Sequence, residues 1–233
     1  MVASLEQAVA MAAGVAIALR GAFHPEASDG VPLLPGGTPA GTLVLAGFVG
    51  RAQWPVFAAS PEASDGRPNP LDLWSRRVID GLAAAIGAHA LYPFEGPPWL
   101  PFQRWAMKAE PVHRSALGML IHRDWGLWHS YRGALAFAER VALPERVESP
   151  SPCDSCAAKP CLTACPVGAF TLERYDVEAC AGHLRSSAGT DCLEPGCRAR
   201  EACPVGAAHR FGRDQAGFHM RAFLASRKAA SDV

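Results

Sequence analysis

All eight cysteines of the chain lie between positions 153 and 203, and the preceding 152 residues contain none. They fall into two groups of four, Cys-x2-Cys-x4-Cys-x3-Cys-Pro and Cys-x11-Cys-x4-Cys-x5-Cys-Pro. Residues 164–169 and residues 202–207 have the same sequence, Ala-Cys-Pro-Val-Gly-Ala, so both groups close in the same way. This duplication predicts two related metal sites within residues 149 to 210.

Four thiolates in each group suit a 4Fe-4S cluster, which needs ligands that converge from several directions. Three cysteines on a short loop can reach three corners of a cluster, and the fourth ligand comes from elsewhere in the chain. In the bacterial ferredoxin run, the last cysteine before proline binds the other cluster. Applied to this chain, that arrangement predicts a first set of Cys153, Cys156, Cys161 and Cys203 and a second set of Cys165, Cys180, Cys192 and Cys197.

Two tetrahedral zinc sites with four thiolates each are an alternative, because zinc accepts Cys-x2-Cys and Cys-x4-Cys spacings. Zinc, however, needs neither the Cys-Pro closures nor an exchange of ligands between the groups. Disulfides are a second alternative, since the number of cysteines is even, but they belong mainly to secreted proteins. We therefore predict iron–sulfur clusters, which carry single electrons at potentials set by hydrogen bonds and burial.

The charge balance bears on the choice of partner. Lys and Arg together number 22, as do Asp and Glu, so no excess positive field draws the chain to a phosphate backbone. The most apolar early stretch, Ala8 to Leu19, contains Gly14 and follows the acidic Glu6. It is too short to span a bilayer and lacks the basic flank of a signal peptide. We expect a helix there, no nucleic acid or membrane partner, and a cytoplasmic protein.

A proline-rich, charged segment over residues 143–152 precedes the cysteines. Proline lacks a backbone donor and biases the preceding residue towards extended geometry, so this composition is typical of a linker. We expect an N-terminal domain of residues 1–148 and a C-terminal domain of residues 149–233. Apolar residues within Ala216 to Arg227 predict a covering helix that packs over the clusters or over the first domain.

Strands and helices both occur in the expected N-terminal domain. The apolar run Gly41 to Val49 predicts a buried strand. Asn69-Pro70 predicts the start of a helix with apolar residues up to Ile86, and Trp105 to Glu110 a second helix. Further strands are expected at residues 88–92 and 134–141, with a hairpin of residues 118–122 and 127–131 around Asp124-Trp125-Gly126. The mixture predicts an α+β fold.

The cysteine pattern, including the isolated Cys180, resembles the ferredoxin module of epoxyqueuosine reductases. Residues 118–133, Gly-Met-Leu-Ile-His-Arg-Asp-Trp-Gly-Leu-Trp-His-Ser-Tyr-Arg-Gly, are similar to a hairpin shared by those reductases and by the cobalamin-processing proteins that dealkylate or decyanate the cofactor. The resemblance implies a nitroreductase-like sheet domain over residues 1–148, followed by a small dicluster ferredoxin-like domain. It also implies that relatives of the sheet domain hold cobalamin in its base-off form.

The resemblance further suggests cofactor-binding residues. In cobalamin-processing relatives, an arginine at the position of Arg132 helps to bind the thiol co-substrate, and His122 lies on the same hairpin. The alternative is structural, because His122, Trp125, Trp128 and Tyr131 recur along one hairpin and aromatic residues on half-buried strands commonly form core or cross-strand pairs.

Three features separate the chain from epoxyqueuosine reductases. Those enzymes carry a catalytic Asp before the helix that precedes the hairpin, whereas residues 92–99 here offer only Glu95, which a solvated loop position also explains. The chain ends soon after the cysteines and does not include their helical-repeat domain for tRNA. Its balanced charge offers no other surface for tRNA. We therefore expect no tRNA epoxyqueuosine reduction, and no catalytic residue is assigned.

Two functions follow from these observations. The first is a ferredoxin-like iron–sulfur protein that transfers single electrons to a redox partner protein. The second is a cobalamin-dependent oxidoreductase or cobalamin-processing factor, in which the clusters reduce a corrinoid bound by the N-terminal domain. The first follows from the cysteines, and the second from analogy.

Overall fold

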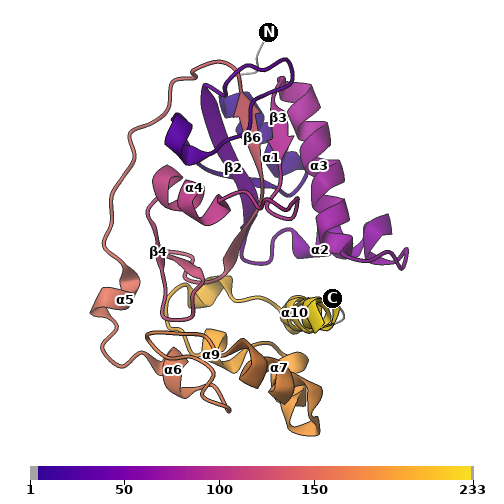
Figure 1. Ribbon diagram of the computed structural model, residues 1–233, viewed down its shortest axis with the longest axis vertical. Coiled ribbons are helices and arrows are strands. Elements are labelled where there is room, and N and C mark those ends of the chain that lie inside the picture. The colour runs from indigo at the N-terminus through magenta and orange to yellow at the C-terminus, as the bar shows by residue number, and fades with distance from the viewer. Residues whose placement is uncertain (1–4, 232–233) are drawn as a thin grey trace. The chain divides into compact units, whose positions relative to one another are not determined.

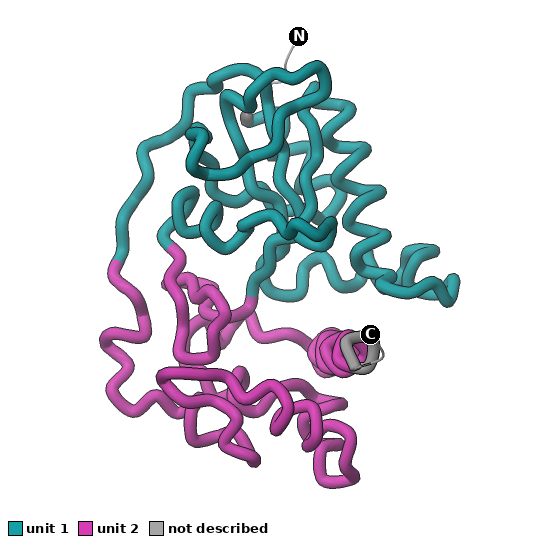
Figure 2. Tube along the Cα trace, viewed as in Figure 1, with its two compact units in different colours: residues 1–111, 129–149 teal, residues 112–128, 150–233 magenta. Residues whose placement is uncertain are grey.

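Two units make up the chain in the computed structural model, which describes residues 5–231. Residues 1–111 and 129–149 form the first unit, and residues 112–128 and 150–233 the second (Figure 2). The expected boundary after residue 148 lies next to the observed one. Residues 112–128, however, belong to the second unit, because Leu117, Ile121 and Leu127 are buried there against Phe170 and Cys203. The nitroreductase-like and ferredoxin-like character of the two domains stays a prediction.

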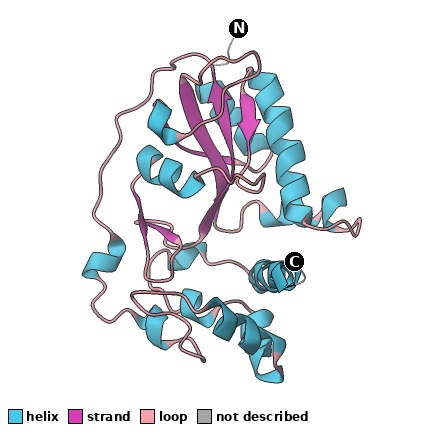
Figure 3. Cartoon of the chain, viewed as in Figure 1, coloured by secondary structure: helices cyan, strands magenta, loops and turns pink. Residues whose placement is uncertain are grey.

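The first unit contains an antiparallel sheet. Its strands, in spatial order, are β1 (Ala18–Phe23), β2 (Thr42–Val49), β6 (His129–Phe137) and β3 (His89–Leu91) (Figure 3). The apolar sequence of β2 explains its place inside the sheet, since seven of its eight residues are buried. The strands predicted over residues 41–49 and 88–92 are thereby confirmed.

Helices α1 (Leu5–Gly14), α2 (Trp54–Ala58), α3 (Pro70–Ile86) and α4 (Phe102–Ala109) belong to the same unit (Figure 1). Helix α3 begins at Pro70, and Gly87 caps its C-terminal end in the left-handed conformation. Helix α3 contacts β3 and β6. Helices α3 and α4 confirm the two helices predicted for this region. Asn69 occupies the N-cap position with φ +54°, and its side chain makes no capping bond.

The N-terminal helix is shorter than predicted. It ends at Gly14, and the backbone turns at Ala16, where φ is +59°. The Ile17 N–H donates to the Ala12 carbonyl at 2.9 Å, and Ile17 is buried. The apolar stretch from Ala8 to Leu19 therefore contains two elements, because its last residues belong to β1.

The predicted hairpin is wrong in its pairing. Strand β5 (Leu120–His122) pairs with β4 (Val112–Arg114), which the sequence analysis did not identify. Around the expected turn, the bridge that the described residues form joins His122 to Gly126, which lies before the second expected strand. From His129 onward the chain belongs to β6, which pairs with the apolar β2 and ends at Phe137, earlier than the predicted residue 141.

Close backbone contact explains the tight turn that replaces this hairpin. Gly126 has φ +57°, and a Cβ atom there would lie 2.0 Å from the Val205 carbonyl oxygen. Gly206 has φ +69°, and a Cβ there would lie 2.3 Å from the carbonyl carbon of Trp125. Only glycine fits both positions. The second copy of the Ala-Cys-Pro-Val-Gly-Ala hexapeptide is thus fixed against residues 125–126.

The second unit consists largely of short helices. They are α5 (Pro152–Ser155), α6 (Pro160–Thr163), α7 (Val177–Arg185), α8 (Thr190–Leu193), α9 (Arg198–Glu201) and α10 (Arg213–Ser231). Helix α10 contains the predicted residues 216–227 and extends beyond them at both ends. Residues 143–151 form neither helix nor strand, as expected of a linker. Within residues 5–231, no helix is long and apolar enough to cross a membrane.

Candidate metal centre

Proline residues position several of the cysteines at helix starts. Cys153 follows Pro152 in α5, and Cys161 follows Pro160 in α6. Proline suits the first helical position, where a backbone N–H has no partner inside the helix. The Ser151 hydroxyl accepts the N–H of Cys153 at 3.3 Å and caps α5. All eight cysteines are free, so the disulfide alternative finds no support in the structure.

Cys203 lies close to the first group of cysteines, although about 40 residues separate it from Cys161 in the chain. Burial raises the pKa of the Cys161 thiol. Three neighbouring thiols raise the same pKa further: Cys203, Cys153 and Cys156. Burial likewise raises the pKa of Cys203, and Cys153 and Cys156 add to it. The four thiols of the predicted first set are therefore near neighbours.

The other four thiols form a second gathering. Burial raises the pKa of Cys180, with a further contribution from Cys165. Burial also raises the pKa of Cys197, and Cys180 and Cys165 add to it. Burial raises the pKa of Cys192, to which Asp191 and Cys197 contribute. One small pocket is lined by all four thiols of the predicted second set.

This grouping fits the proposed clusters chemically. A thiol pKa raised by burial means that the isolated thiolate is poorly solvated, and a bound metal cation replaces the proton and compensates the charge. Each set brings four thiols together, which is the number that one 4Fe-4S cluster takes. The assignment of individual ligands stays a prediction.

Hydrogen-bond donors also point at the sulfur atoms. The Ala169 N–H donates to the Cys165 Sγ at 3.3 Å, within the first hexapeptide. The backbone of Ala199 and Arg200 forms hydrogen bonds with the Cys197 thiol, which lower its pKa against the larger effect of burial. The Tyr175 hydroxyl bonds to the Cys180 thiol. Donors of this kind tune the potential of a cluster through its thiolates.

A positive side chain lies near each set. The Lys159 ammonium donates to the carbonyl oxygens of Cys153 and Cys156, at 3.0 and 3.1 Å. Burial lowers the pKa of Arg200 to about 10, and the nearby Cys197 opposes this shift. The Arg200 guanidinium lies over the rings of Trp128 and Phe211, at 4.7 and 4.4 Å, and donates to the Leu127 carbonyl. These cations offset the negative charge that thiolate ligands bring.

Arg132, one of the two predicted cofactor-binding residues, interacts with helix α3. Its guanidinium pairs with the Asp72 carboxylate and donates to the Ser75 hydroxyl at 3.0 Å. The same guanidinium lies 5.4 Å from the Phe94 ring centroid. These contacts attach β6 to α3 and give Arg132 a structural role within the first unit.

His122, the other predicted cofactor-binding residue, stabilises the turn that follows β5. Its Nδ1 accepts the N–H groups of Asp124 and Trp125, at 3.1 and 3.4 Å. Its ring stacks on that of Trp125, with centroids 3.9 Å apart. Trp128 is fully buried and packs on Phe211. The contacts of these aromatic residues correspond to the structural alternative.

Glu95 lies at the surface. Its carboxylate forms an ion pair with Arg76 at 2.5 Å, and both side chains are more than 40% exposed. Arg76 also lies over the Tyr92 ring, 4.6 Å from its centroid. An exposed, paired carboxylate of this kind is the solvated loop Glu that the sequence analysis offered as the alternative to a catalytic acid.

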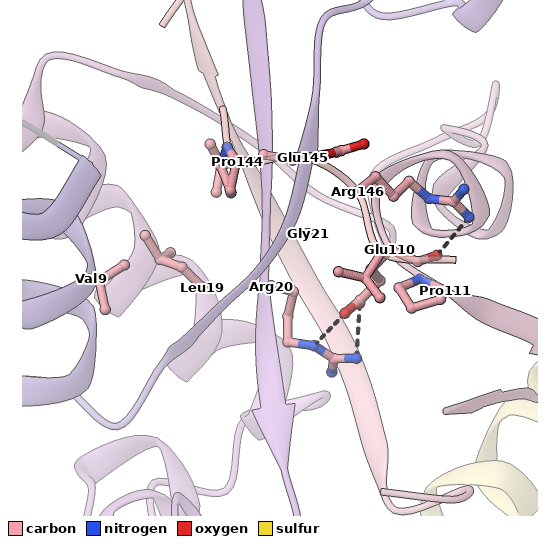
Figure 4. Close-up of a pocket in the computed structure, with 13 residues that line it drawn as sticks. Val9, Leu19, Arg20, Gly21, Glu110, Pro111, Pro144, Glu145 and Arg146 are labelled. Carbon is pink, nitrogen blue, oxygen red and sulfur yellow. Dashed lines mark hydrogen bonds and ion pairs between the residues drawn. The ribbon is translucent and has the colours of Figure 1, made fainter. Parts of the chain in front are cut away.

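A cavity of about 220 Å³ lies in the first unit, and Figure 4 shows the residues that line it. Arg20 and Glu110 form a buried ion pair in its wall, with N and O atoms 2.8 Å apart. The Arg146 guanidinium donates to the Glu110 carbonyl at 3.4 Å. Cavities for drug-sized ligands reach roughly 300–1,000 Å³, so this one is too small for a corrinoid. Arg132 does not line it.

Sequence reasoning missed several of these groups. Tyr175 and His183 lie beside cysteines, and the position of His183 one helical turn after Cys180 was a signal that could have identified it. Arg20 and Glu110 are 90 positions apart, so their pairing left no local pattern.

No family model and no curated protein matches the chain. Among solved structures, a selenomethionine-labelled epoxyqueuosine reductase has a TM-score of 0.54 at 14% identity, covering 91% of this chain and 68% of that one. The epoxyqueuosine reductase from Streptococcus thermophilus has a TM-score of 0.51 at 13% identity, covering 86% and 65%. The C. elegans B12-trafficking protein CblC has a TM-score of 0.48 at 12% identity, covering 94% and 95%.

The likeness to epoxyqueuosine reductases confirms the expected resemblance at the level of the fold. The chain spans about two thirds of the length of those reductases. It has a mixed helix and sheet fold, as predicted. At these identities, the shared fold does not carry over activity or ligands.

Proposed function

We propose that this chain is an iron–sulfur redox protein whose second unit transfers single electrons through two 4Fe-4S clusters. The observation that carries the proposal is the gathering of the eight free thiols into two sets of four. The grouping of Cys203 with the first set supports the exchange of closing ligands between the two halves. When bound there, the clusters supply one-electron chemistry.

The residues around each set have defined tasks in this proposal. Lys159 and Arg200 offset the charge of the thiolates and of the added electron. Backbone donors such as the Ala169 N–H, together with the Tyr175 hydroxyl, stabilise the reduced state and so raise the potential. Two zinc sites would also satisfy four thiolates each, and they would be redox-silent.

The test is a reductive titration of the anaerobically purified full chain. We expect visible absorption that bleaches on stepwise addition of dithionite, with one electron taken up for each cluster. A variant with Cys153→Ser and Cys180→Ser, one ligand from each set, is the control and should lose the chromophore. A colourless, redox-silent protein that contains stoichiometric zinc would contradict the proposal.

A cobalamin-dependent reductase is the second candidate. The fold likeness to an epoxyqueuosine reductase extends over 91% of the chain and so includes the first unit. In this case the first unit would bind a corrinoid, and the clusters would reduce it. In the carrier case, the electron acceptor is a partner protein.

Titration of the chain with base-on cobalamin separates these candidates. Binding in the base-off form shifts the corrinoid spectrum and favours the reductase. An unchanged spectrum, together with electron transfer to an added acceptor protein, favours the carrier. Arg132 and His122 are the predicted cofactor-binding residues. The same titration of the His122→Gln variant tests whether His122 contributes to corrinoid binding, because this substitution leaves the ion pair between Arg132 and Asp72 intact.

A further inference from the structure

His183 has a buried ring nitrogen without a hydrogen-bond partner in the described part of the chain. It lies on α7, three residues after Cys180, so the two side chains occupy the same face of the helix. The His183 side chain is 11% exposed, and its Nε2 is buried and makes no hydrogen bond. Buried polar groups almost always have partners, so this nitrogen calls for an explanation.

The surroundings of Nε2 point to the second set of thiols. His183 lines the small pocket that contains all four of them. A ring nitrogen of His183, a carboxylate oxygen of Asp191 and the Sγ of Cys192 lie within 4.8 Å of one another. The nearest Asp191 oxygen is 3.9 Å from Nε2, too far for a hydrogen bond, and Asp191 is paired with Arg198 at 2.8 Å.

We infer that the Nε2–H of His183 donates a hydrogen bond to the second cluster, on the side of Cys192, and thereby raises the potential of that cluster. The inference rests on the proposed function and names a residue that adjusts one of the two centres. Reduction adds negative charge to the cluster, and an N–H donor beside its sulfur atoms stabilises the reduced form. The carboxylate of Asp191 near Nε2 favours the tautomer with its proton on this nitrogen.

A donor role fits the site better than direct ligation by the imidazole. The four thiols of the second set already provide four ligands. Coordination by His183 would leave the buried Cys192 without a metal to bind. His183 is therefore a positioning and tuning residue, and the cluster remains bound by cysteines only.

The test compares His183→Leu with His183→Gln in the full chain, loaded with iron and kept anaerobic. Both variants should retain the iron content of the unsubstituted protein. In a redox titration followed by EPR, His183→Leu should lower one of the two midpoint potentials and leave the other unchanged. His183→Gln keeps a side-chain N–H and should restore part of the shift. Arg185→Leu, at an exposed position of the same helix, is the matched control and should move neither potential.

Pulsed EPR of the reduced, unsubstituted protein completes the test, even if His183→Leu fails to load iron. Labelling with 15N-histidine should reveal a weak nitrogen coupling, typical of a hydrogen bond. A strong coupling, typical of direct ligation, or no coupling at all would overturn the inference. Unchanged potentials in an iron-loaded His183→Leu variant would also overturn it, and both results would leave the proposed function intact. Absence of iron from the unsubstituted protein would instead refute the proposed function.

Discussion

The two units differ in what holds them together. In the first unit, β2 buries seven of its eight residues, and α3 and α4 together bury Trp74 and Trp105. In the second unit, four helices have only four residues each, and six of the eight cysteines stay partly exposed. Burial of apolar surface can stabilise the first unit. A helix of one turn does not compensate the cost of its own nucleation, so the second unit needs another source of stability.

The core of the second unit indicates what that source is. Phe170, Ala169 and Ala199 form its centre, and most of the partly buried residues packed against them are cysteines. When a metal binds only the folded arrangement of its ligands, its binding free energy becomes folding free energy. The first unit is therefore stabilised by its apolar core, whereas we expect the proposed clusters to stabilise the short helices of the second unit.

Removal of iron should have the largest effect. Oxidation followed by chelation should unfold the second unit, because five of its helices are shorter than ten residues and lose their common attachment. The far-UV circular dichroism signal of these helices should be lost, while hydrogen exchange should still show protection of the buried strand β2 in the first unit. If the helix content of the second unit survived complete loss of iron, the proposed difference in stability between the two units would be contradicted.

Single ligand substitutions should remove one cluster and leave the other. Cys203→Ser should release the cluster of the first set, and Cys165→Ser that of the second. Because ligands of one cluster act as a unit, adding Cys153→Ser to Cys203→Ser should cause no further loss of iron. Adding Cys180→Ser to Cys203→Ser should remove the remaining cluster. The opposite pattern would show that the two halves do not exchange their closing cysteines.

A core substitution in the first unit should lower the stability of that unit without changing the metal content of the chain. Leu45 on β2 is fully buried, and Leu45→Ala should lower the free energy of unfolding of the first unit by about 2–5 kcal/mol. Leu33, which is 62% exposed, provides the control Leu33→Ala with little effect. Denaturant unfolding followed by tryptophan fluorescence measures the change. Loss of iron from the folded Leu45→Ala variant in the absence of denaturant would show that the units are not independent.

The ion pair between the exposed Arg77 and the buried Glu62 should give the smallest effect, which is present near neutral pH and is lost in acid. Hydrogen bonds from Arg77 lower the pKa of Glu62 from 4.5 to about 2. A carboxyl whose pKa is lower in the folded state stabilises that state above its unfolded pKa, and this contribution disappears as pH falls from 4.5 towards 2. Glu62→Gln should therefore reduce unfolding free energy near neutral pH and approach the unsubstituted protein in acid. A difference that grows on acidification would contradict this sign.

The parts of the fold that the sequence predicted are those that depend on local signals. The apolar run of β2, the Asn69-Pro70 start of α3 and the paired Cys-Pro closures are local signals, and the structure contains the corresponding elements. The pairing of β5 was missed because its partner β4 has only three residues, Val112–Arg114, which is too short for a clear alternating pattern. Local alternation around Asp124-Trp125-Gly126 indicated a turn correctly but could not identify the partner strand.

The candidate site shows the same division. The spacing marked two groups of four cysteines, and the arrangement of the bacterial ferredoxin run predicted that the groups exchange their closing members. The contacts of Arg132 with Asp72 and Ser75 follow from the packing of β6 on α3, which no motif records. His183 was overlooked because no helix was predicted over residues 177–185, and only a helix places its side chain on the same face as Cys180.

Metal analysis of the anaerobically purified chain tests the central claim most directly. Iron and acid-labile sulfide should each be present at about eight per chain, as expected for two 4Fe-4S clusters, and Mössbauer spectra should show iron in tetrahedral sulfur sites. Stoichiometric zinc, with no labile sulfide and no visible absorption, would contradict the account.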